Sequence, residues 1–297
     1  MLPLPGFVAT GEPADVTIEY GVVPDSLPGA AQVRVCTQAR PGQFLLTVDR
    51  VAKYLVENGS RITIQPAPGA TDDEVRLFLM GSVWSALLLQ RGLLPLHGSA
   101  VRVKDRAIVL AGTSGNGKST LTASLMDLGF LFIADELCAL DIKENSPPLL
   151  LPGFPQILLW DDSLRILGKA PHSLTPVRPG LEKYIFALGG SVERPPDKGT
   201  FFEKTLIQTS PLPLERIYIL IVTNTPSYHF IPLHGVRKIH ALIDCTYRVH
   251  HVTGLGLNAP HFKQCTNIAH YLDVKQVERP ASPFDIENLA KLIAEDF

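Results

Sequence analysis

Short apolar runs separated by Pro and Gly dominate the first quarter of the chain. β-branched and aliphatic residues cluster or alternate within these runs, a pattern typical of strands joined by turns. We predict strands at Asp15–Tyr20, Ala31–Thr37, Gln43–Val48 and Arg61–Pro66. The pattern therefore predicts a small, mostly β N-terminal region over residues 1–70.

The spacing of apolar residues becomes helical after this region. The apolar run from Leu77 to Leu89 is shorter than the roughly 20 residues that cross a bilayer, so it predicts a buried helix. Thr71 and Glu74 have the spacing of a capping box at its start, and Gly92 is a natural stop at its end. We assign this helix to the beginning of a second domain.

The second domain, residues 71–297, alternates strand and helix patterns. Strands are expected at 94–103 and 106–111, followed by a Gly-rich loop, a helix from Lys118 and a strand ending at Asp135. This order predicts an α/β fold with a βαβ core. Further predictions are an apolar loop at 147–160, a helix at 161–168, a strand near 183–188, a central strand at 214–224, an exposed loop at 195–199 and helices at 235–249, 261–273 and 284–297.

The Gly-rich loop matches G-x-x-x-x-G-K-[ST], the P-loop motif. Its glycines allow backbone N–H groups to point at phosphate oxygens, and the following helix adds its N-terminal dipole. Lys118 is expected to reach the β- and γ-phosphates, and the Ser119 hydroxyl to bind Mg²⁺. The predicted nucleotide contacts here are Gly112, Ser114, Gly115, Asn116, Gly117, Lys118, Ser119 and Thr120.

Two acids and a histidine are further candidates for this site. Asp135 ends a strand that we expect directly beside the strand preceding the motif, so that its carboxylate meets the phosphates, where it can hold Mg²⁺ or accept a proton. Glu136 follows on the opposite face and should have a different role. His97 precedes Gly98 and Ser99, which suggest a tight backbone passage near a ligand.

The balance of charged residues indicates which classes of partner to expect. The chain has 27 Lys and Arg against 29 Asp and Glu and shows no long basic run. A basic stripe is the usual feature of nucleic-acid or anionic-membrane binding, so we expect neither partner.

The N-terminal residues lack the pattern of a signal peptide, and the four cysteines form no CxxC pair. We therefore expect a cytoplasmic protein with reduced thiols.

Three stretches together resemble the C-terminal catalytic domain of bacterial HPr kinase/phosphorylase. They are LLPLHGSAV (93–101), GTSGNGKST (112–120) and LGFLFIADEL (128–137). The resemblance implies a P-loop kinase core of the HPr kinase and phosphoenolpyruvate carboxykinase type, which uses ATP and Mg²⁺ to phosphorylate a seryl hydroxyl. LPGFPQILLWDDSLRILG (151–168) with LEKY (181–184) resembles lasso-peptide precursor kinases, which phosphorylate a C-terminal serine.

The resemblance also implies roles for single residues. Lys118 and Ser119 would bind phosphate and Mg²⁺, and Asp135 would be the base and a metal neighbour. His97 matches the family histidine. Glu136 replaces the family's second aspartate, which keeps the charge but extends the carboxylate by one methylene. The implied metal-binding set is Ser119, Asp135 and Glu136, and the implied catalytic set is Asp135, His97 and Lys118.

A basic loop adds two candidate contacts. PVRPG (176–180) resembles a substrate or phosphate loop of HPr kinase, which makes Arg178 and Lys183 candidate contacts to ATP or to the transferred phosphate. Because HPr kinases are hexamers, the resemblance also favours a homo-oligomer.

We therefore expect an enzyme, a serine kinase that uses ATP and Mg²⁺. It would transfer the γ-phosphate to a Ser or Thr hydroxyl of a peptide or small protein, such as a lasso-peptide precursor. A small-molecule kinase of the same fold and a non-catalytic nucleotide-binding partner stay open as alternatives. A motor or transport NTPase is disfavoured because no LSGGQ-like signature precedes Asp135.

Overall fold

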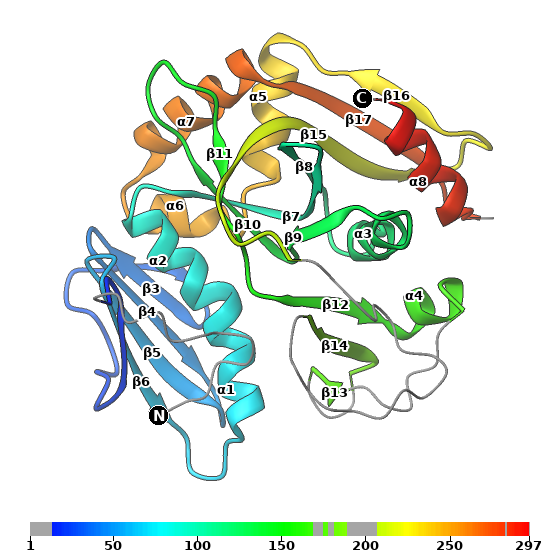
Figure 1. Ribbon diagram of the computed structural model, residues 1–297. Coiled ribbons are helices and arrows are strands. Elements are labelled where there is room, and N and C mark those ends of the chain that lie inside the picture. Colours follow the sequence, from blue (N-terminus) through cyan, green and yellow to red (C-terminus); the bar gives the residue numbers. More distant parts are fainter. Residues whose placement is uncertain (1–13, 169–174, 178–180, 189–206, 283, 297) are drawn as a thin grey trace. The chain divides into compact units, whose positions relative to one another are not determined.

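The computed structural model describes residues 14–168, 175–177, 181–188, 207–282 and 284–296 (Figure 1). These residues form a mixed α/β fold, which confirms the predicted class. The chain divides into two compact units. The first comprises Met1–Pro95 and Thr246–Gln264, and the second comprises Leu96–Cys245 and Cys265–Phe297.

The first unit is built on a six-stranded sheet with the order β1-β6-β5-β4-β3-β2. β1 runs parallel to β6, whereas the other neighbouring pairs are antiparallel. The β-rich N-terminal region is thus confirmed, although the stretch expected as one strand at 31–37 forms parts of two. The sequence does not predict β5, whose Ala, Lys and Glu are uncommon in strands. The bounds are β1 (Thr17–Tyr20), β2 (Ala31–Arg34), β3 (Thr37–Arg40), β4 (Gln43–Val48), β5 (Ala52–Glu57) and β6 (Arg61–Pro66).

The predicted helix that follows is confirmed, with its start and stop signals. It consists of α1 (Asp72–Phe78), a π-helical turn (Leu79–Val83) and α2 (Trp84–Gln90). The Thr71 hydroxyl accepts from the Glu74 amide while the Glu74 carboxylate accepts from the Thr71 amide, as a capping box requires. The helix is capped at Arg91, directly before Gly92.

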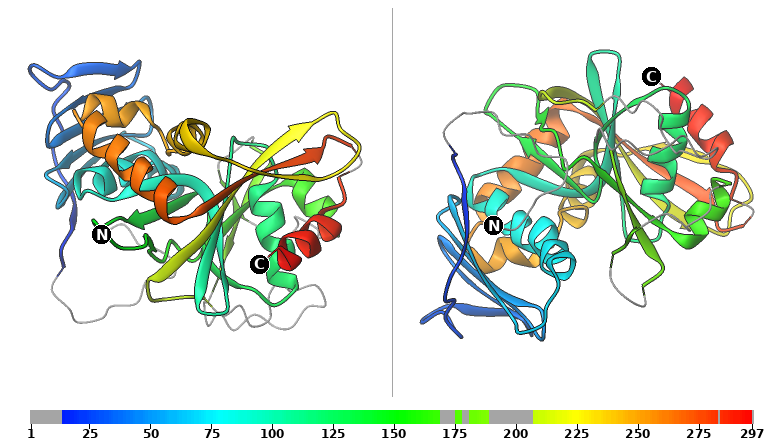
Figure 2. Two further views of the ribbon diagram at one scale, coloured as in Figure 1. Left: turned by 90° about the horizontal axis from the view of Figure 1, so that it is seen from above. Right: turned by 60° about the horizontal axis from the view of Figure 1, so that its bottom comes forward.

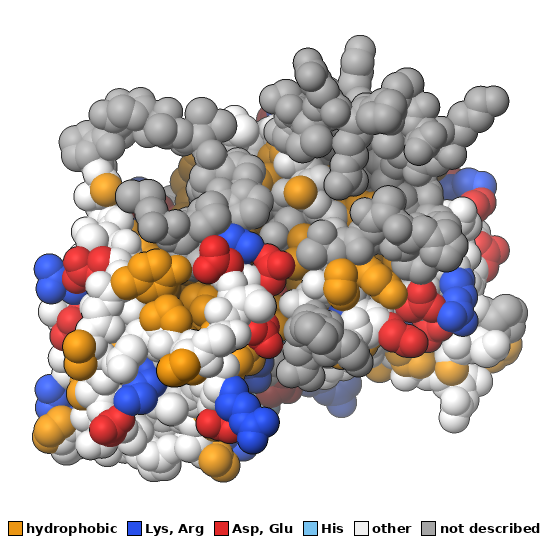
Figure 3. All heavy atoms as spheres, turned by 90° about the horizontal axis from the view of Figure 1, so that it is seen from below, with side chains coloured by type: hydrophobic (Ala, Val, Ile, Leu, Met, Phe, Trp, Pro, Cys, Tyr) orange, Lys and Arg blue, Asp and Glu red, His pale blue; other side chains and the backbone are white. Residues whose placement is uncertain are grey.

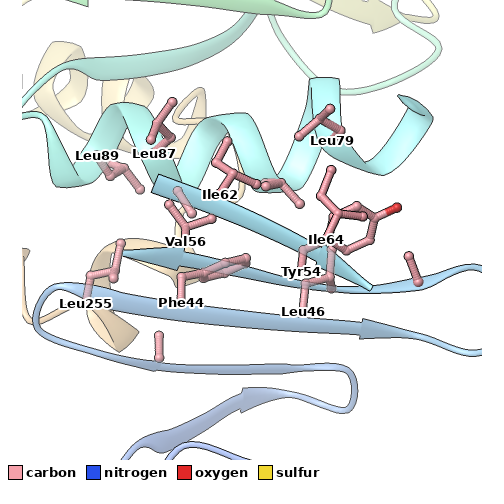
Figure 4. Close-up of a cluster of buried hydrophobic side chains, with 14 of the residues drawn as sticks. Phe44, Leu46, Tyr54, Val56, Ile62, Ile64, Leu79, Leu87, Leu89 and Leu255 are labelled. Atoms are coloured by element: carbon pink, nitrogen blue, oxygen red, sulfur yellow. The ribbon is translucent and has the colours of Figure 1, made fainter. Parts of the chain in front are cut away.

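Apolar side chains fill the space between this helix and the sheet, as Figure 4 shows. Phe44, Tyr54 and Ile62 on the strands face Leu79 and Leu87 on the helix, and all are at most 1% exposed. Burying each such side chain contributes about 1.5–3 kcal/mol. The sheet provides the partner for the helix's apolar face, and the first compact unit includes the helix and extends to residue 95.

A segment from far along the chain completes this core. α6 (His250–Gly254) and the residues after it place Val252 and Leu255 in the same buried cluster as Phe44. This return of the chain has no local pattern in the sequence, because it depends on a tertiary partner.

His251 on α6 predicts an acid-sensitive first unit. The ring is 1% exposed, lies edge-on to Phe44 and is hydrogen-bonded to Ser85 at 3.1 Å. Burial, together with the charges of His250 and Arg248, lowers the pKa of His251 to about 3. In the unfolded chain His251 binds a proton near pH 6.5, whereas in the folded protein it stays neutral to a much lower pH. The free energy of unfolding therefore decreases as the pH falls from 6.5 towards 3. We expect a loss of about 1.6 kcal/mol between pH 6.5 and 5 in urea titrations, and a smaller loss in His251→Asn. An identical acid dependence in both proteins would contradict this assignment.

The second unit contains an eight-stranded sheet. Its order is β11-β10-β7-β8-β15-β17-β16, with β9 paired to β7 and an additional pairing between β11 and β15. β8, β15 and β17 are mutually parallel, and β15 is the central strand predicted near residues 214–224. The bounds are β7 (Leu94–Val103), β8 (Arg106–Ala111), β9 (Leu131–Ala134), β10 (Leu137–Asp141), β11 (Leu149–Leu150), β15 (Leu212–Thr223), β16 (His229–Pro232) and β17 (Asp273–Pro280).

The strand that leads to Asp135 does not lie directly beside the strand that precedes the motif, so that expectation is wrong. β7 forms a hairpin with β8 and lies between β8 and β9, antiparallel to both. β8 and β9 therefore point in the same direction but are separated by one strand. The βαβ pattern in the sequence cannot reveal the intervening strand, because β7 precedes β8 along the chain and is not part of the β8-α3-β9 segment.

A three-stranded sheet corrects a second expectation. Residues 147–160 were expected as a loop, but they contain β11 and also β12 (Gln156–Trp160), which pairs with β14 (Lys183–Ala187). Pro152 and Pro155 lie outside β12, so the prolines that suggested a loop only flank the strand. β13 (Thr175–Pro176) completes this sheet, and α4 (Asp161–Ile166) follows β12 as predicted. The loop expected at 195–199 lies outside the described residues.

The remaining helices expected from the sequence are present in the structure. α3 (Lys118–Asp127) and α8 (Ile286–Glu295) lie side by side against the eight-stranded sheet in both views of Figure 2. α5 (Gly235–Asp244) and α7 (Asn258–Tyr271) match the other predicted helices. The sequence does not predict β17, because its Lys, Gln, Glu and Arg residues obscure the alternation of a strand.

Charged side chains of both signs are mixed on the face of the described residues that Figure 3 shows. Among the helices in the described ranges, none has both the length and the hydropathy of a transmembrane segment.

Candidate functional site

The candidate site is centred on the loop Gly112–Gly117, which joins β8 to α3 and is called the motif loop below. Its three glycines have positive φ values of 132°, 87° and 88°. A Cβ at Gly112 would lie 2.7 Å from the Leu220 carbonyl oxygen on β15, so this position requires glycine. α3 begins at Lys118 without a side-chain cap, which leaves its first N–H groups without intrahelical partners.

Lys118 folds back over the motif loop. Its Nζ donates to the carbonyl oxygens of Gly112 and Thr113, both at 3.0 Å, and the residue is 6% exposed. Burial lowers the pKa of Lys118 below the ordinary lysine value, although the negative charges of Glu136 and Asp135 act in the opposite direction. The ammonium group is therefore held at the loop without a direct salt bridge to either acid in the structure.

Asp135 is held by three hydrogen-bond donors. Its Oδ1 accepts from the Ser99 hydroxyl and from the Ser119 hydroxyl, the latter at 2.9 Å, and its Oδ2 accepts from the Leu158 amide at 2.8 Å. Burial, followed by the nearby charge of Glu136, raises the pKa of Asp135, whereas the hydrogen bonds from Leu158 and Ser99 and the charge of Lys183 oppose the rise. Asp135 thus contacts the motif through Ser119, even though β7 separates β9, which leads to Asp135, from β8, which leads to the motif loop.

Ser99 is a site residue whose role the sequence does not reveal. It lies on β7 beside Gly98, where a Cβ would stand 2.8 Å from the Leu110 carbonyl oxygen of β8. The close backbone approach expected at Gly98 is therefore an approach to the neighbouring strand β8. Ser99 is fully buried, and its hydroxyl binds Asp135.

Glu136 lies in a strained turn between β9 and β10. The Leu137 amide donates to the Asp135 carbonyl oxygen at 2.8 Å, and Glu136 between them has a φ of 68°, which describes a γ-turn. Such a conformation costs about 1–3 kcal/mol and persists where surrounding contacts fix it. The turn separates the environments of the two adjacent acids.

The Glu136 carboxylate lies between a lysine and a histidine. Oε2 is 3.1 Å from Lys183 Nζ of β14, and Oε1 is 3.7 Å from His97 Nε2 of β7. Burial acts to raise the pKa of Glu136, but the charges of Lys183, His97 and Lys118 outweigh it and lower the pKa below the ordinary value. Glu136 is therefore ionised near neutral pH.

A cavity of about 520 Å³ adjoins the motif loop within the second unit. Trp160, 39% exposed, stands at its border with Lys183 Nζ 5.7 Å from the centre of its ring. The side chains and loop residues predicted from the sequence that line this cavity are His97, Ser114, Gly115, Gly117, Lys118, Ser119, Thr120, Glu136 and Lys183.

Two of the predicted residues also hold the motif loop and α3 in place. The Asn116 side chain donates to the Leu220 carbonyl oxygen at 2.6 Å and so anchors the motif loop to β15. The Thr120 hydroxyl donates to Ser163 of α4 at 2.8 Å. Arg178 lies outside the described residues. Arg279, which the sequence analysis did not single out, also lines the cavity.

The oxygen atoms at the motif fit a magnesium ion. Mg²⁺ in nucleotide sites is held by one or two protein oxygens together with phosphates and water. The Ser119 hydroxyl and the Asp135 carboxylate form such a pair, whereas Glu136 is engaged by Lys183 and His97. No group of three His, Cys, Asp or Glu side chains in the described part of the chain is arranged to hold a metal alone.

Comparisons with known proteins add a weak structural likeness. The sequence matches no protein-family model and no curated protein. A solved structure of the Hpr(Ser) kinase/phosphatase from Coxiella burnetii is similar with a TM-score of 0.32 and 12% identity, over 68% of this chain and 86% of that chain. A likeness at this level carries no functional weight.

Proposed function

We propose that this protein is a kinase that transfers the γ-phosphate of ATP to a Ser or Thr hydroxyl of a peptide or small protein. The observation that carries the proposal is the hydrogen bond between Ser119, the second residue of α3, and the buried Asp135. In P-loop enzymes a serine or threonine of the loop and an acid at the end of a strand hold Mg²⁺ together. Here Ser119 lines one cavity together with Lys118 and a second acid, Glu136, and Asp135 is hydrogen-bonded to Ser119.

The motif loop and Lys118 would bind the phosphates of ATP. Backbone N–H groups and the N-terminus of α3 favour an anion at this position. Lys118 would exchange its two carbonyl partners for phosphate oxygens. When bound by Ser119 and Asp135, Mg²⁺ would neutralise charge on the β- and γ-phosphates.

The geometry favours different roles for the two acids. Three donors already occupy most of the roughly four acceptor positions of the Asp135 carboxylate, which suits it to orient Ser119 and meet Mg²⁺. Glu136 borders the cavity and is paired with His97, so we assign to it the acceptance of the hydroxyl proton. Proton acceptance by Asp135, implied by the family resemblance, is the alternative assignment.

Lys183 would take part in charge stabilisation. Its Nζ is 3.1 Å from Glu136, and the residue lines the same cavity as Lys118. A second ammonium group at this position can neutralise charge on the transferred phosphoryl group. The acceptor would be a seryl peptide, such as a lasso-peptide precursor, and the reaction would take place in the cytoplasm, where ATP is available.

Lys118→Ala is expected to weaken ATP binding by about 10- to 100-fold. The variant removes charged hydrogen bonds to phosphate, each worth about 1.5–3 kcal/mol. Isothermal titration calorimetry with Mg-ATP measures the effect. Lys143→Ala is the matched control, because the Lys143 side chain is 71% exposed and its ammonium group is paired with Asp141 on β10. Equal affinities in the Lys118→Ala and control proteins would remove Lys118 from the phosphate site.

Release of ADP with different acceptors tests the proposed class of enzyme. The kinase proposal expects ADP formation that depends on a seryl peptide. ADP formation without any acceptor would indicate an NTPase, and formation only with small alcohols would indicate a small-molecule kinase. Binding of ATP without ADP formation under any of these conditions would indicate a non-catalytic partner.

A further inference from the structure

A buried arginine supports the motif loop from the C-terminal end of β17. Arg279 is 7% exposed. Its Nε donates to the Asn116 carbonyl oxygen at 3.0 Å, and its Nη2 donates to the Gly115 carbonyl oxygen at 3.4 Å. Its Nη1 donates to the Pro280 carbonyl oxygen at 3.0 Å, which fixes the guanidinium to its own strand end.

An aromatic ring holds the other face of this guanidinium. The Arg279 guanidinium carbon lies 3.9 Å from the centre of the Phe284 ring, within the range of a cation–π contact. The same ring limits the motif loop, since a Cβ at Gly117 would lie 3.2 Å from it. Arg279 is thus packed between the loop and Phe284 and has little freedom to turn away.

The contacts match what a phosphate-binding loop requires. A loop that turns its N–H groups towards an anion turns carbonyl groups away from it, and buried carbonyls need donors. The planar guanidinium offers several N–H groups in a fixed arrangement, so it can bind two successive carbonyls at once. Its positive charge also favours an anion in the cavity that both Arg279 and the loop line.

We propose that Arg279 is a positioning residue that keeps the motif loop in its phosphate-binding conformation. This inference rests on the proposed function, in which the loop binds the phosphates of ATP. Arg279 acts through the carbonyls of Gly115 and Asn116, and the ring of Phe284 keeps it in place. The C-terminal strand β17 thereby becomes part of the nucleotide site.

Arg279→Gln tests the inference through two readouts. Calorimetry with Mg-ADP, which needs no acceptor, is expected to show a rise in Kd of about tenfold, equivalent to about 1.4 kcal/mol. Hydrogen exchange of the free protein is expected to become faster at the amides of residues 113–118 while the strand amides of β15 keep their protection. Addition of millimolar guanidinium should restore part of the affinity in Arg279→Gln but not change that of the native protein.

Two further variants keep the test decisive. Phe284→Leu removes the ring but leaves the arginine, so a smaller rise in Kd of about threefold is expected, and it also serves if Arg279→Gln does not fold. Arg106→Gln is the matched control, because Arg106 is an exposed arginine on β8 paired with Glu215.

Two results would overturn the inference. One is a native-like Kd together with native-like loop exchange in Arg279→Gln. The other is an increase in exchange throughout the unit without rescue by guanidinium, which would show a merely structural arginine. If the native protein binds no nucleotide, the proposed function fails, and exchange at residues 113–118 in the variant still decides whether Arg279 holds the loop.

Discussion

Asp135→Asn is expected to lower the rate of phosphoryl transfer about a thousandfold. The carboxylate accepts from Ser99, Ser119 and the Leu158 amide. An amide in its place has one oxygen and one NH₂ group, so it cannot accept from all three donors as they stand. It also lacks the negative charge that would meet Mg²⁺ beside Ser119. Initial rates of peptide phosphorylation at saturating Mg-ATP measure the effect.

The Mg²⁺ dependence of ATP binding separates this role from general damage. ATP without metal should bind Asp135→Asn and the native protein with similar affinity, whereas the gain in affinity from Mg²⁺ should be lost in the variant. Asp141→Asn, on β10 and paired with Lys143, provides a control in which both quantities stay native. A native rate of transfer in Asp135→Asn would contradict the assignment of Asp135 to this site.

Glu136→Gln is expected to reduce transfer by about 10²- to 10⁴-fold while leaving the Kd of Mg-ATP within a few-fold of native. Glutamine has the same length and can still accept from Lys183, so the γ-turn and the contact at 3.1 Å can persist. What it loses is the ability to accept a proton from the substrate hydroxyl. Single-turnover rates with a seryl peptide, measured alongside calorimetry, separate the loss of chemistry from a loss of binding.

Glu215→Gln provides the control for this substitution. Glu215 is a partly exposed acid on β15 that is paired with Arg106, and its loss should leave transfer native. A large rise in the Kd of Mg-ATP for Glu136→Gln, with a native rate at saturation, would instead place Glu136 in nucleotide binding. A native rate and a native Kd would remove it from the mechanism.

Local signals in the sequence predict the parts of the fold and of the site that depend on neighbouring residues. The glycines of the motif loop, the helix from Lys118 and the capping box at Thr71 each follow from a few adjacent positions. The central strand β15 follows from a continuous apolar run. In each case the physical requirement, such as a positive φ or a buried face, acts within one element.

Contacts between distant segments could not be predicted in the same way. The hairpin partner β7 separates β8 from β9, so Asp135 reaches Ser119 across a strand that brings Ser99 with it. Arg279 reaches the loop because β17 pairs with β15, yet the polar residues of β17 do not mark it as a strand.

The backbone of Glu136 adopts a conformation that the local sequence does not predict, and contacts from distant segments stabilise it. A glutamate rarely adopts a positive φ, and nothing in its immediate sequence requires a γ-turn. Lys183 from β14 and His97 from β7 fix the side chain from outside the turn. The extra methylene relative to aspartate lets this carboxylate extend from the turn to both partners.

Mass spectrometry of seryl peptides after incubation with this protein, ATP and Mg²⁺ tests the central claim most directly. Peptides ending in serine, beginning with those encoded next to the gene for this chain, are the first substrates to examine. The proposal predicts that a peptide gains one phosphate on serine with the native protein and gains none with Asp135→Asn. Absence of phosphate on every seryl peptide, while the native protein binds Mg-ATP, would contradict the claim that it is a peptide kinase.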